Sequence, residues 1–417
     1  MLVYTNTMFI FRPRKQNQQS TQPIQQIPFQ PGEAGITPPV PPQEPPKDMG
    51  KRVVFLFAGI VIIYLIAFGI FMLLGGGKKL DKAFPKKEDN KSQMENGADC
   101  KEPACLTGVD KIEPAAVPLY ELTIPALREK KYESKLGNLE AAYDNLNYTA
   151  YLTNYTSEGL KVNGLLTKPT GEMPEGGWPT IIFIHGYIPP TQYETMGQAY
   201  STYVDYMARN GFVVFKIDLR GHGESEGEPG GGYYGADYVT DALNAYTALE
   251  SVDFVNKKKI GLWGHSMAGN IVMRSLAAKT DIPAAVIWAG AVYSYTDQRK
   301  YGINDNSYRP PDLASQRNNR RQRIYEKVGS PSAQSAFWQQ MAPTSYLGDI
   351  KGAIEIHHAV DDDVVNIGYS RDLVELLDKT SVPHELFEYQ SGGHNISGES
   401  FNQAMGRTVE FYRKNLK

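Results

Sequence analysis

The chain has 417 residues and is nearly neutral, with 43 lysines and arginines against 46 aspartates and glutamates and a formal net charge of −3. This balance argues against a nucleic-acid partner, which usually requires a basic face. Two cysteines exclude a disulfide scaffold and a multi-cysteine metal protein. The length allows two or three domains at roughly 100–200 residues each.

The first segment, residues 1–52, is predicted to be a disordered tail. Between positions 12 and 52 it is rich in proline and glutamine, and Phe29 is its only aromatic residue. Such a composition buries too little apolar surface to offset the entropy of ordering, and its prolines favour local polyproline II structure. A proline-rich ligand for another protein is the alternative.

Residues 53–74 are predicted to form a transmembrane helix. The segment contains no charged residue and no proline. A helix of this length extends about 33 Å, enough to cross the roughly 30 Å hydrocarbon core of a bilayer. A cleaved signal peptide is disfavoured because about 50 residues precede the segment and no small-residue cleavage site follows it.

The orientation of this single-pass membrane protein remains open. Lysines and arginines are more numerous in the linker, residues 75–114, which favours a cytoplasmic location for the linker and for the domain after it. Cys100 and Cys105 lie close together in this linker, and a disulfide between them would fit an oxidising exterior. Two free thiols are the alternative. We expect the domain after the linker to be extracytoplasmic.

Residues 115–417 are predicted to form one α/β domain with a mostly parallel, eight-stranded sheet flanked by helices. Two early antiparallel strands are followed by alternating strand and helix patterns. The strand-like runs are 150–155, 161–167, 180–184, 212–217, 260–263, 284–289, 353–357 and 385–389. The helix-like runs are 195–209, 236–251, 268–278, 369–377 and 400–415. Sites in such sheets lie at the carboxyl ends of the strands.

Ser266 is the candidate nucleophile. It stands between a predicted strand and a predicted helix, in the run Gly264-His265-Ser266-Met267-Ala268-Gly269. A serine at such a tight corner exposes its hydroxyl, and the corner requires small neighbours on both sides. A serine that only caps the helix is the alternative.

A nucleophilic serine needs a base, and the base needs an orienting acid. In an α/β fold with the serine at such a corner, the chain order is Ser, then Asp or Glu, then His. Asp361 follows a predicted strand and is the expected acid, with Asp362 and Asp363 as solvated loop charges. His394 lies in a glycine-rich loop and is the expected base, whereas His384 begins a strand and is expected to be structural.

The oxyanion hole is predicted from two backbone N–H groups. One belongs to Met267, the residue after the nucleophile, and the other to Tyr187, after His185 and Gly186 in the loop that follows strand 180–184. Glycine at position 186 lets the backbone approach the reacting group closely.

Asp218 and Arg220 follow the next predicted strand along the chain. They either bind substrate or brace the loops around the nucleophile. A metal site formed by His357, His358 and Asp361 is disfavoured, because adjacent residues of a strand point to opposite faces. We expect no metal and no cofactor.

Together these residues resemble the α/β-hydrolase superfamily, and within it the prolyl oligopeptidase-type catalytic domain and related acyl-peptidase, esterase and dienelactone-hydrolase branches. The resemblance covers residues 147–417 and rests on 155–166, 184–186, 218–225, 264–269, Asp361 and 393–395. The resemblance implies a catalytic triad of Ser266, Asp361 and His394.

The chain also departs from this pattern. Fewer than 80 residues separate the linker from the first matching strand, so no β-propeller fits. His358 stands at a position usually occupied by glycine, and Val365 at one usually occupied by proline. The resemblance implies a lid over residues 299–346. This segment contains Arg317, Arg320, Arg321 and Arg323. They either favour a substrate with an acidic group or a terminal carboxylate, or they are solvated charges on a helix.

The expected function is a membrane-anchored serine hydrolase that cleaves a small ester or a short peptide through an acyl-enzyme. The resemblance favours a peptidase, and a carboxylesterase or lipase-like hydrolase is the alternative. A non-catalytic binding protein on a hydrolase fold is the second alternative. The sequence leaves the oligomeric state open.

Overall fold

The computed structural model describes residues 117–230, 232–304 and 311–417. These residues belong to one compact unit, Lys101–Lys417. The predicted tail, transmembrane span and linker lie outside the described residues. Within the described ranges, every helix is too short or too polar to cross a membrane.

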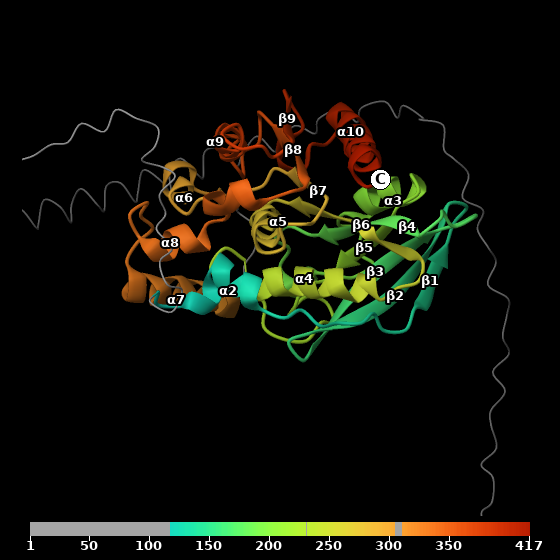
Figure 1. Cartoon of the computed structure of the whole chain (residues 1–417), viewed down its shortest axis with the longest axis horizontal. Coiled ribbons are helices and arrows are strands. Elements are labelled where there is room, and N and C mark those ends of the chain that lie inside the picture. Colours follow the sequence, from blue (N-terminus) through green and yellow to red (C-terminus); the bar gives the residue numbers. More distant parts are fainter. Residues whose placement is uncertain (1–116, 231, 305–310) are drawn as a thin grey trace, which may run out of the picture. The chain divides into compact units, whose positions relative to one another are not determined.

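A nine-stranded sheet forms the centre of the described domain, in the order β1-β2-β3-β5-β4-β6-β7-β8-β9 (Figure 1). The strands are β1 (Glu140–Asp144), β2 (Tyr148–Ser157), β3 (Leu160–Pro169), β4 (Trp178–Ile184), β5 (Val213–Ile217), β6 (Val255–His265), β7 (Ala284–Trp288), β8 (Ala353–Ala359) and β9 (His384–Tyr389). The pairs β1–β2, β2–β3 and β3–β5 are antiparallel, and the remaining pairs are parallel.

The prediction of eight strands was wrong by one. The additional strand is β1, which pairs with β2 at the edge of the sheet. Its sequence, Glu140-Ala141-Ala142-Tyr143-Asp144, is rich in residues that disfavour strands, and most of it is exposed. The segment forms a strand because it pairs with β2, and not because its own sequence has a strand-like hydrophobic pattern.

The interior strands have the sequences expected of strands covered on both faces. All residues of β5 are buried, as are all but one of β4, and both are largely apolar. Their parallel register aligns Ile184 with Ile217 on one side and with Gly264 on the other. The loops after β4, β5 and β6 therefore emerge side by side at the same edge of the sheet.

Helices cover both faces of the sheet (Figure 1). The α-helices are α2 (Ile124–Glu129), α3 (Ser201–Arg209), α4 (Asp237–Glu250), α5 (Met267–Ala278), α6 (Asp297–Tyr301), α7 (Pro311–Val328), α8 (Ala336–Met341), α9 (Gly368–Leu377) and α10 (Glu399–Asn415). Helices α3 and α10 bury residues in one apolar core, and α4, α5 and α9 in another. Helix α3 begins at Ser201, six residues later than predicted, after turns that end at Tyr200 with a left-handed φ of 64°.

Helices α6, α7 and α8 occupy the insertion between β7 and β8 that was expected to form a lid. Arg320 of α7 is not a purely solvated charge, because its Nη1 donates to Asp237 Oδ2 at 2.8 Å and to the Gly230 carbonyl at 3.3 Å. Arg321 and Arg323 are exposed. The side chain of Arg317 lies outside the described residues.

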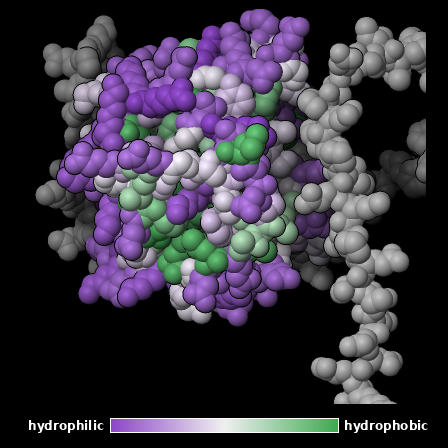
Figure 2. Space-filling model, turned by 90° about the vertical axis from the view of Figure 1, so that its right-hand side faces the viewer, coloured by the Kyte–Doolittle hydropathy of each residue, from purple (hydrophilic) through white to green (hydrophobic). Residues whose placement is uncertain are grey.

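The surface of the domain is mainly hydrophilic on the face shown in Figure 2, with apolar groups gathered in a few places. Among large apolar side chains, Leu146 in the turn between β1 and β2 is the most exposed of those described, at 95%. This turn precedes β2 and lies at the end of the sheet opposite the carboxyl ends of the parallel strands.

Candidate active site

Ser266 occupies a strained corner between β6 and α5. Its φ of 57° and ψ of −116° lie in a region that residues other than glycine rarely adopt. The neighbours must be small: a Cβ added at Gly264 would lie 2.7 Å from Val272 Cγ2, and one at Gly269 would lie 2.6 Å from Gly290 Cα. The local sequence therefore presents the serine hydroxyl at the end of a buried strand.

His394 lies in the loop after β9, where residues 393–395 form a short 3₁₀ turn. Its Nδ1 lies 2.8 Å from Asp362 Oδ2. His394 and Ser266 line the same pocket, together with Tyr187 and the Gly392–Asn395 loop. No hydrogen bond joins Ser266 Oγ to the His394 ring among the described residues, so the structure brings the two groups to one pocket without direct contact.

The structure places Asp362, rather than the expected Asp361, against the His394 ring. Asp361 does not contact the His394 ring; its carboxylate accepts the N–H groups of Gly392 and Gly393, at 3.3 and 2.9 Å. Asp362 turns inward instead, and its side chain is fully buried. The physical reason is a tight turn: Asp362 Oδ1 accepts the N–H groups of Val364 and Val365, both at 2.9 Å. This turn leaves Oδ2 facing the histidine.

The Asp362 carboxylate is ionised. Burial acts to raise its pKa, but contacts with His358 and His394 and the backbone hydrogen bond from Val365 outweigh burial and hold the pKa well below its usual range. A charged Asp362 requires a proton on His394 Nδ1, since that nitrogen faces the carboxylate. The other ring nitrogen, Nε2, is then available as a base.

One hydrogen-bond network joins the three loops of the site. The N–H of Gly186 donates to Tyr200 Oη at 3.0 Å, and Tyr200 Oη lies 2.7 Å from His265 Nδ1. His265 Nε2 lies 2.8 Å from the carbonyl oxygen of His394. Burial lowers the pKa of His265 to about 3, so the ring is neutral, with its proton on the nitrogen that faces this carbonyl. His265 therefore supports the loop that carries His394 through its side chain.

The loop after β4 is rigidly held. His185 is fully buried, and its ring nitrogens lie 2.7 Å from the Gly186 carbonyl and 2.9 Å from that of Asp218. Burial lowers the pKa of His185 to about 3. A Cβ on Gly186 would lie 2.6 Å from Tyr200 Oη, so only glycine fits beside that hydroxyl. Tyr187 follows and lines both pockets that contain Ser266.

Asp218 and Arg220 brace loops and do not reach the substrate pocket. Asp218 is fully buried and accepts hydrogen bonds from Tyr193 and Thr195, at 2.8 and 2.5 Å. Arg220 is 8% exposed. Its guanidinium binds Asp241 at 2.7 Å and Glu158 at 2.9 Å. The substrate-binding alternative for these two residues does not fit their burial.

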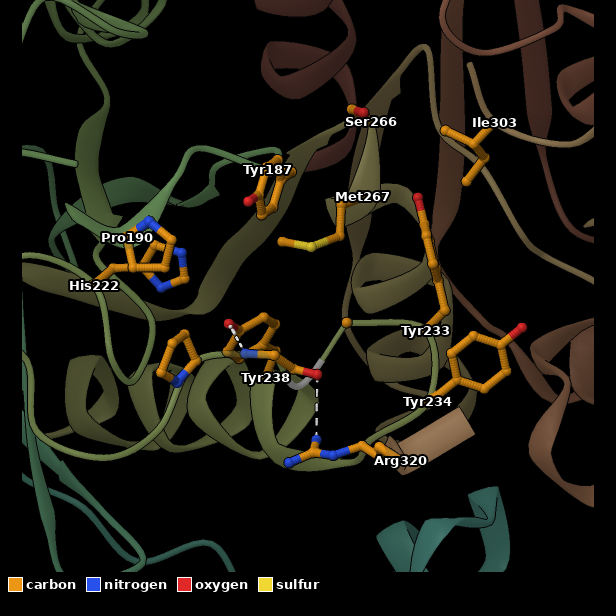
Figure 3. Close-up of a pocket in the computed structure, with 13 residues that line it drawn as sticks. Tyr187, Pro190, His222, Tyr233, Tyr234, Tyr238, Ser266, Met267, Ile303 and Arg320 are labelled. Atoms are coloured by element: carbon orange, nitrogen blue, oxygen red, sulfur yellow. Dashed lines mark hydrogen bonds between the residues drawn. The ribbon is translucent and has the colours of Figure 1, made fainter. Parts of the chain in front are cut away.

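An aromatic pocket extends from Ser266 toward helix α7 (Figure 3). Its empty volume is about 770 Å³, part of it open to solvent. In Figure 3, Ser266 lies at one edge, Tyr187 and Met267 lie beside it, and Arg320 lies at the far end. The remaining wall is mainly tyrosine, proline and glycine, from Pro190, His222, Pro229, Gly230, Gly232, Tyr233, Tyr234, Tyr238 and Ile303.

The histidines of β8 have protein partners rather than a common metal. His357 lies 2.9 Å from Tyr389 Oη and 2.8 Å from Glu355 Oε1. His358 lies 2.7 Å from Ser370 Oγ. Within the described ranges, no group of three candidate ligands could hold a metal ion.

Sequence reasoning missed Tyr200 and His358, besides Asp362. Tyr200 precedes a helix by one residue, and nothing in its spacing indicates contact with a loop that is 65 positions away. His358 was noted as a departure from glycine and as a member of a disfavoured metal site, not as a partner of the acid. A histidine four residues before an aspartate was a usable indication, because the structure places its Nε2 3.2 Å from Asp362 Oδ2.

Comparison with known proteins agrees with this architecture. The family model described as "Serine aminopeptidase, S33" matches residues 179–310. The uncharacterized peptidase YtmA of Bacillus subtilis (strain 168) is 24% identical over 271 residues, which cover 64% of this chain and 93% of that protein.

Two solved structures show the same fold. The acylaminoacyl peptidase of Pyrococcus horikoshii has a TM-score of 0.52 and 18% identity, over 65% of this chain and 42% of its own. An acetyl xylan esterase from a Paenibacillus species has a TM-score of 0.50 and 17% identity, over 70% of this chain and 99% of its own. The chain thus spans less than half of the larger peptidase and almost all of the esterase.

The described domain is an α/β-hydrolase domain of the peptidase and esterase type. The protein is a serine hydrolase.

Proposed function

We propose that the protein hydrolyses an ester or amide bond through Ser266, His394 and Asp362, by way of an acyl-enzyme. The observation that carries this proposal is the 2.8 Å contact between His394 Nδ1 and Asp362 Oδ2, in a loop that shares a pocket with Ser266. Because Nδ1 faces Asp362, Nε2 is the ring nitrogen of His394 that is left to act as the base in the pocket that contains Ser266.

In the proposed reaction, His394 Nε2 removes the hydroxyl proton of Ser266 as Oγ attacks the carbonyl carbon. The Asp362 carboxylate stabilises the imidazolium that forms and keeps its orientation. His394 then gives the proton to the leaving group, and the acyl group stays on Ser266. Water activated by His394 releases the acid and restores the serine.

The oxyanion is stabilised by the backbone N–H groups of Met267 and Tyr187 in this proposal. Met267 is the first residue of α5, where helix N–H groups have no partner within the helix and the helix dipole favours negative charge. Tyr187 follows Gly186, which is held by Tyr200. Removing one such donor typically costs about 10²–10³-fold in kcat.

The aromatic pocket favours an apolar or aromatic group on the substrate, next to the scissile bond. We propose a peptidase first, because the family match and the curated relative carry peptidase names. A carboxylesterase is the second candidate, supported by an esterase of this fold that is matched over 99% of its own length and 70% of this chain.

Labelling with a fluorophosphonate tests the proposed chemistry directly. We expect the full-length protein to be labelled on Ser266, and the Ser266→Ala variant to remain unlabelled. Equal labelling of the two proteins, or no labelling of the wild type, would show that Ser266 is not an activated nucleophile and would favour the binding-protein alternative.

Hydrolysis assays then separate the two candidate activities. Aminoacyl anilides test the peptidase and short-chain aryl esters test the esterase, each against Ser266→Ala. Amide turnover that depends on Ser266 supports the peptidase. Ester turnover alone, with no amide turnover at high enzyme concentration, contradicts it.

We also propose that residues 53–74 anchor the protein in a membrane, with the catalytic domain outside the cytoplasm. The support is the uninterrupted apolar sequence of this segment. Alkaline carbonate should leave the protein in the membrane fraction, and deletion of 53–74 should release it. Protease added to intact cells should degrade the domain; protection of the domain would contradict the orientation.

A further inference from the structure

His358 of β8 lies directly behind the proposed triad. Its side chain is fully buried, and Nε2 lies 3.2 Å from Asp362 Oδ2. The same nitrogen lies 2.9 Å from the carbonyl oxygen of Val365, and Nδ1 lies 2.7 Å from Ser370 Oγ. The ring therefore contacts the acid, the turn that comes after the acid, and helix α9.

The partners determine where the proton of His358 lies. Nε2 faces only acceptors, a carbonyl oxygen and a carboxylate oxygen, so it carries a proton. Nδ1 can accept the hydroxyl proton of Ser370, which fixes the ring in one tautomer. The N–H edge of this imidazole thus stays directed toward the turn that contains Asp362.

These contacts complete the surroundings of the Asp362 carboxylate. Oδ1 accepts the backbone N–H groups of Val364 and Val365. Oδ2 faces two imidazoles, His394 on the pocket side at 2.8 Å and His358 on the buried side at 3.2 Å. A carboxylate held from both sides has one orientation, and that orientation faces the proposed base.

We propose that His358 is a positioning residue of this hydrolase, which acts through Asp362 to hold the carboxylate toward His394. Ser370 supports it by fixing the tautomer. The proposal rests on the proposed function, and it adds a second imidazole to the acid side of the triad.

The test compares His358→Leu, which removes the N–H group, with His358→Gln, which can restore a donor. We expect His358→Leu to lower kcat per active site by about 10- to 100-fold, the range for groups that orient a functional side chain, with KM little changed. His358→Gln should recover most of the loss. Ser370→Ala should show a smaller decrease of the same kind.

His357→Leu is the matched control. His357 is the neighbouring residue of β8, is equally buried, and contacts Glu355, Tyr389 and Thr408 rather than Asp362. Its substitution should lower the yield of folded protein but leave kcat per titrated active site unchanged. A kcat for His358→Leu equal to that of His357→Leu would overturn the proposal.

A second measurement does not depend on turnover. The proton between His394 Nδ1 and Asp362 should give a far-downfield NMR resonance in the full-length chain. We expect this resonance to be lost or broadened in His358→Leu and present in His357→Leu and His358→Gln. An unchanged resonance in His358→Leu contradicts the positioning role. A wild-type protein that shows the resonance but no labelling contradicts only the proposed hydrolysis.

Discussion

The carboxylate of Asp362 lies 2.8 Å from Nδ1 of His394, whereas the adjacent Asp361 binds two backbone N–H groups of the loop that carries this histidine. Two consecutive aspartates thus contact the same loop, one through the histidine ring and the other through the backbone. Asp362 orients the ring, and Asp361 holds the backbone.

Substitution separates these two roles. Asp362→Asn should lower kcat by about 10⁴-fold, as expected when the acid of a triad no longer fixes the histidine tautomer. Asp361→Asn keeps an acceptor for the loop and should cost less than about tenfold, since one hydrogen bond contributes about 0.5–1.5 kcal/mol. Steady-state kinetics of both variants measure the difference. A larger loss in Asp361→Asn would restore the assignment made from the sequence.

The buried ion pair of Arg220 predicts a large effect on stability. Arg220→Met leaves Asp241 buried without its cation, which should lower the free energy of unfolding by about 3–5 kcal/mol. Arg371→Met is the control, because Arg371 and Glu388 form an exposed pair that contributes about 0–1 kcal/mol. Chemical denaturation compares the two, and similar losses would argue against the bracing role of Arg220.

Crowding around Ser266 predicts the effect of one added methyl group. Gly269→Ala would force its Cβ to within 2.6 Å of Gly290 Cα, a backbone atom that cannot rotate away. We expect a loss of about 1–3 kcal/mol in stability, with reduced labelling of Ser266. Gly348→Ala has open space around its Cβ and should be tolerated. Thermal unfolding and labelling rates of the two variants provide the measurement.

Buried histidines predict a loss of stability as the pH falls. Burial lowers the pKa of His185 to about 3, of His222 to about 4 and of His265 to about 3. The unfolded chain takes up these protons below about pH 6.5, so folding is progressively opposed from there down to the folded pKa values. Each of these histidines lowers the free energy of unfolding by up to about 1.4 kcal/mol per pH unit in this range.

Buried carboxyl groups act in the opposite direction, because burial raises the pKa of Asp218, Asp241, Glu250 and Asp297. Burial, followed by the charge of Asp372, raises the pKa of Asp297 to about 6, so the folded state gains a proton there that the unfolded chain gains only at lower pH. The buried histidines and the buried carboxyl groups therefore contribute with opposite signs to the proton uptake on unfolding near pH 5. The pH dependence of unfolding between about pH 6.5 and 5 measures this uptake, and His222→Asn should reduce it by about one proton. A pH dependence unchanged in His222→Asn would contradict a neutral buried histidine.

The aromatic pocket predicts how specificity changes. Tyr233 is 8% exposed and forms part of the pocket wall beside Ser266. Tyr233→Ala should lower kcat/KM for substrates with a large apolar acyl or side-chain group and affect acetyl esters little, since burial of such a group is worth about 1.5–3 kcal/mol. Equal losses for large and small substrates would show that the group binds elsewhere.

Most of the domain could be predicted from the sequence, because buried strands such as β4 and β5 are continuously apolar. The alternation of strand and helix patterns then placed Ser266 and His394 after predicted strands. The sequence did not identify β1, whose pairing with β2 is a tertiary effect. It also could not choose among three consecutive aspartates. Which of them turns inward depends on the backbone N–H groups that Asp362 Oδ1 accepts, and composition and spacing do not reveal these contacts.

The contact between His265 and the carbonyl of His394 has a consequence for motion. His265 is covalently next to Ser266, and its ring also contacts Tyr200, which binds Gly186. His265 therefore joins the loop after β9 to the strand-to-helix corner that carries Ser266. We expect a displacement of that loop to be transmitted to the corner through side chains as well as through the sheet.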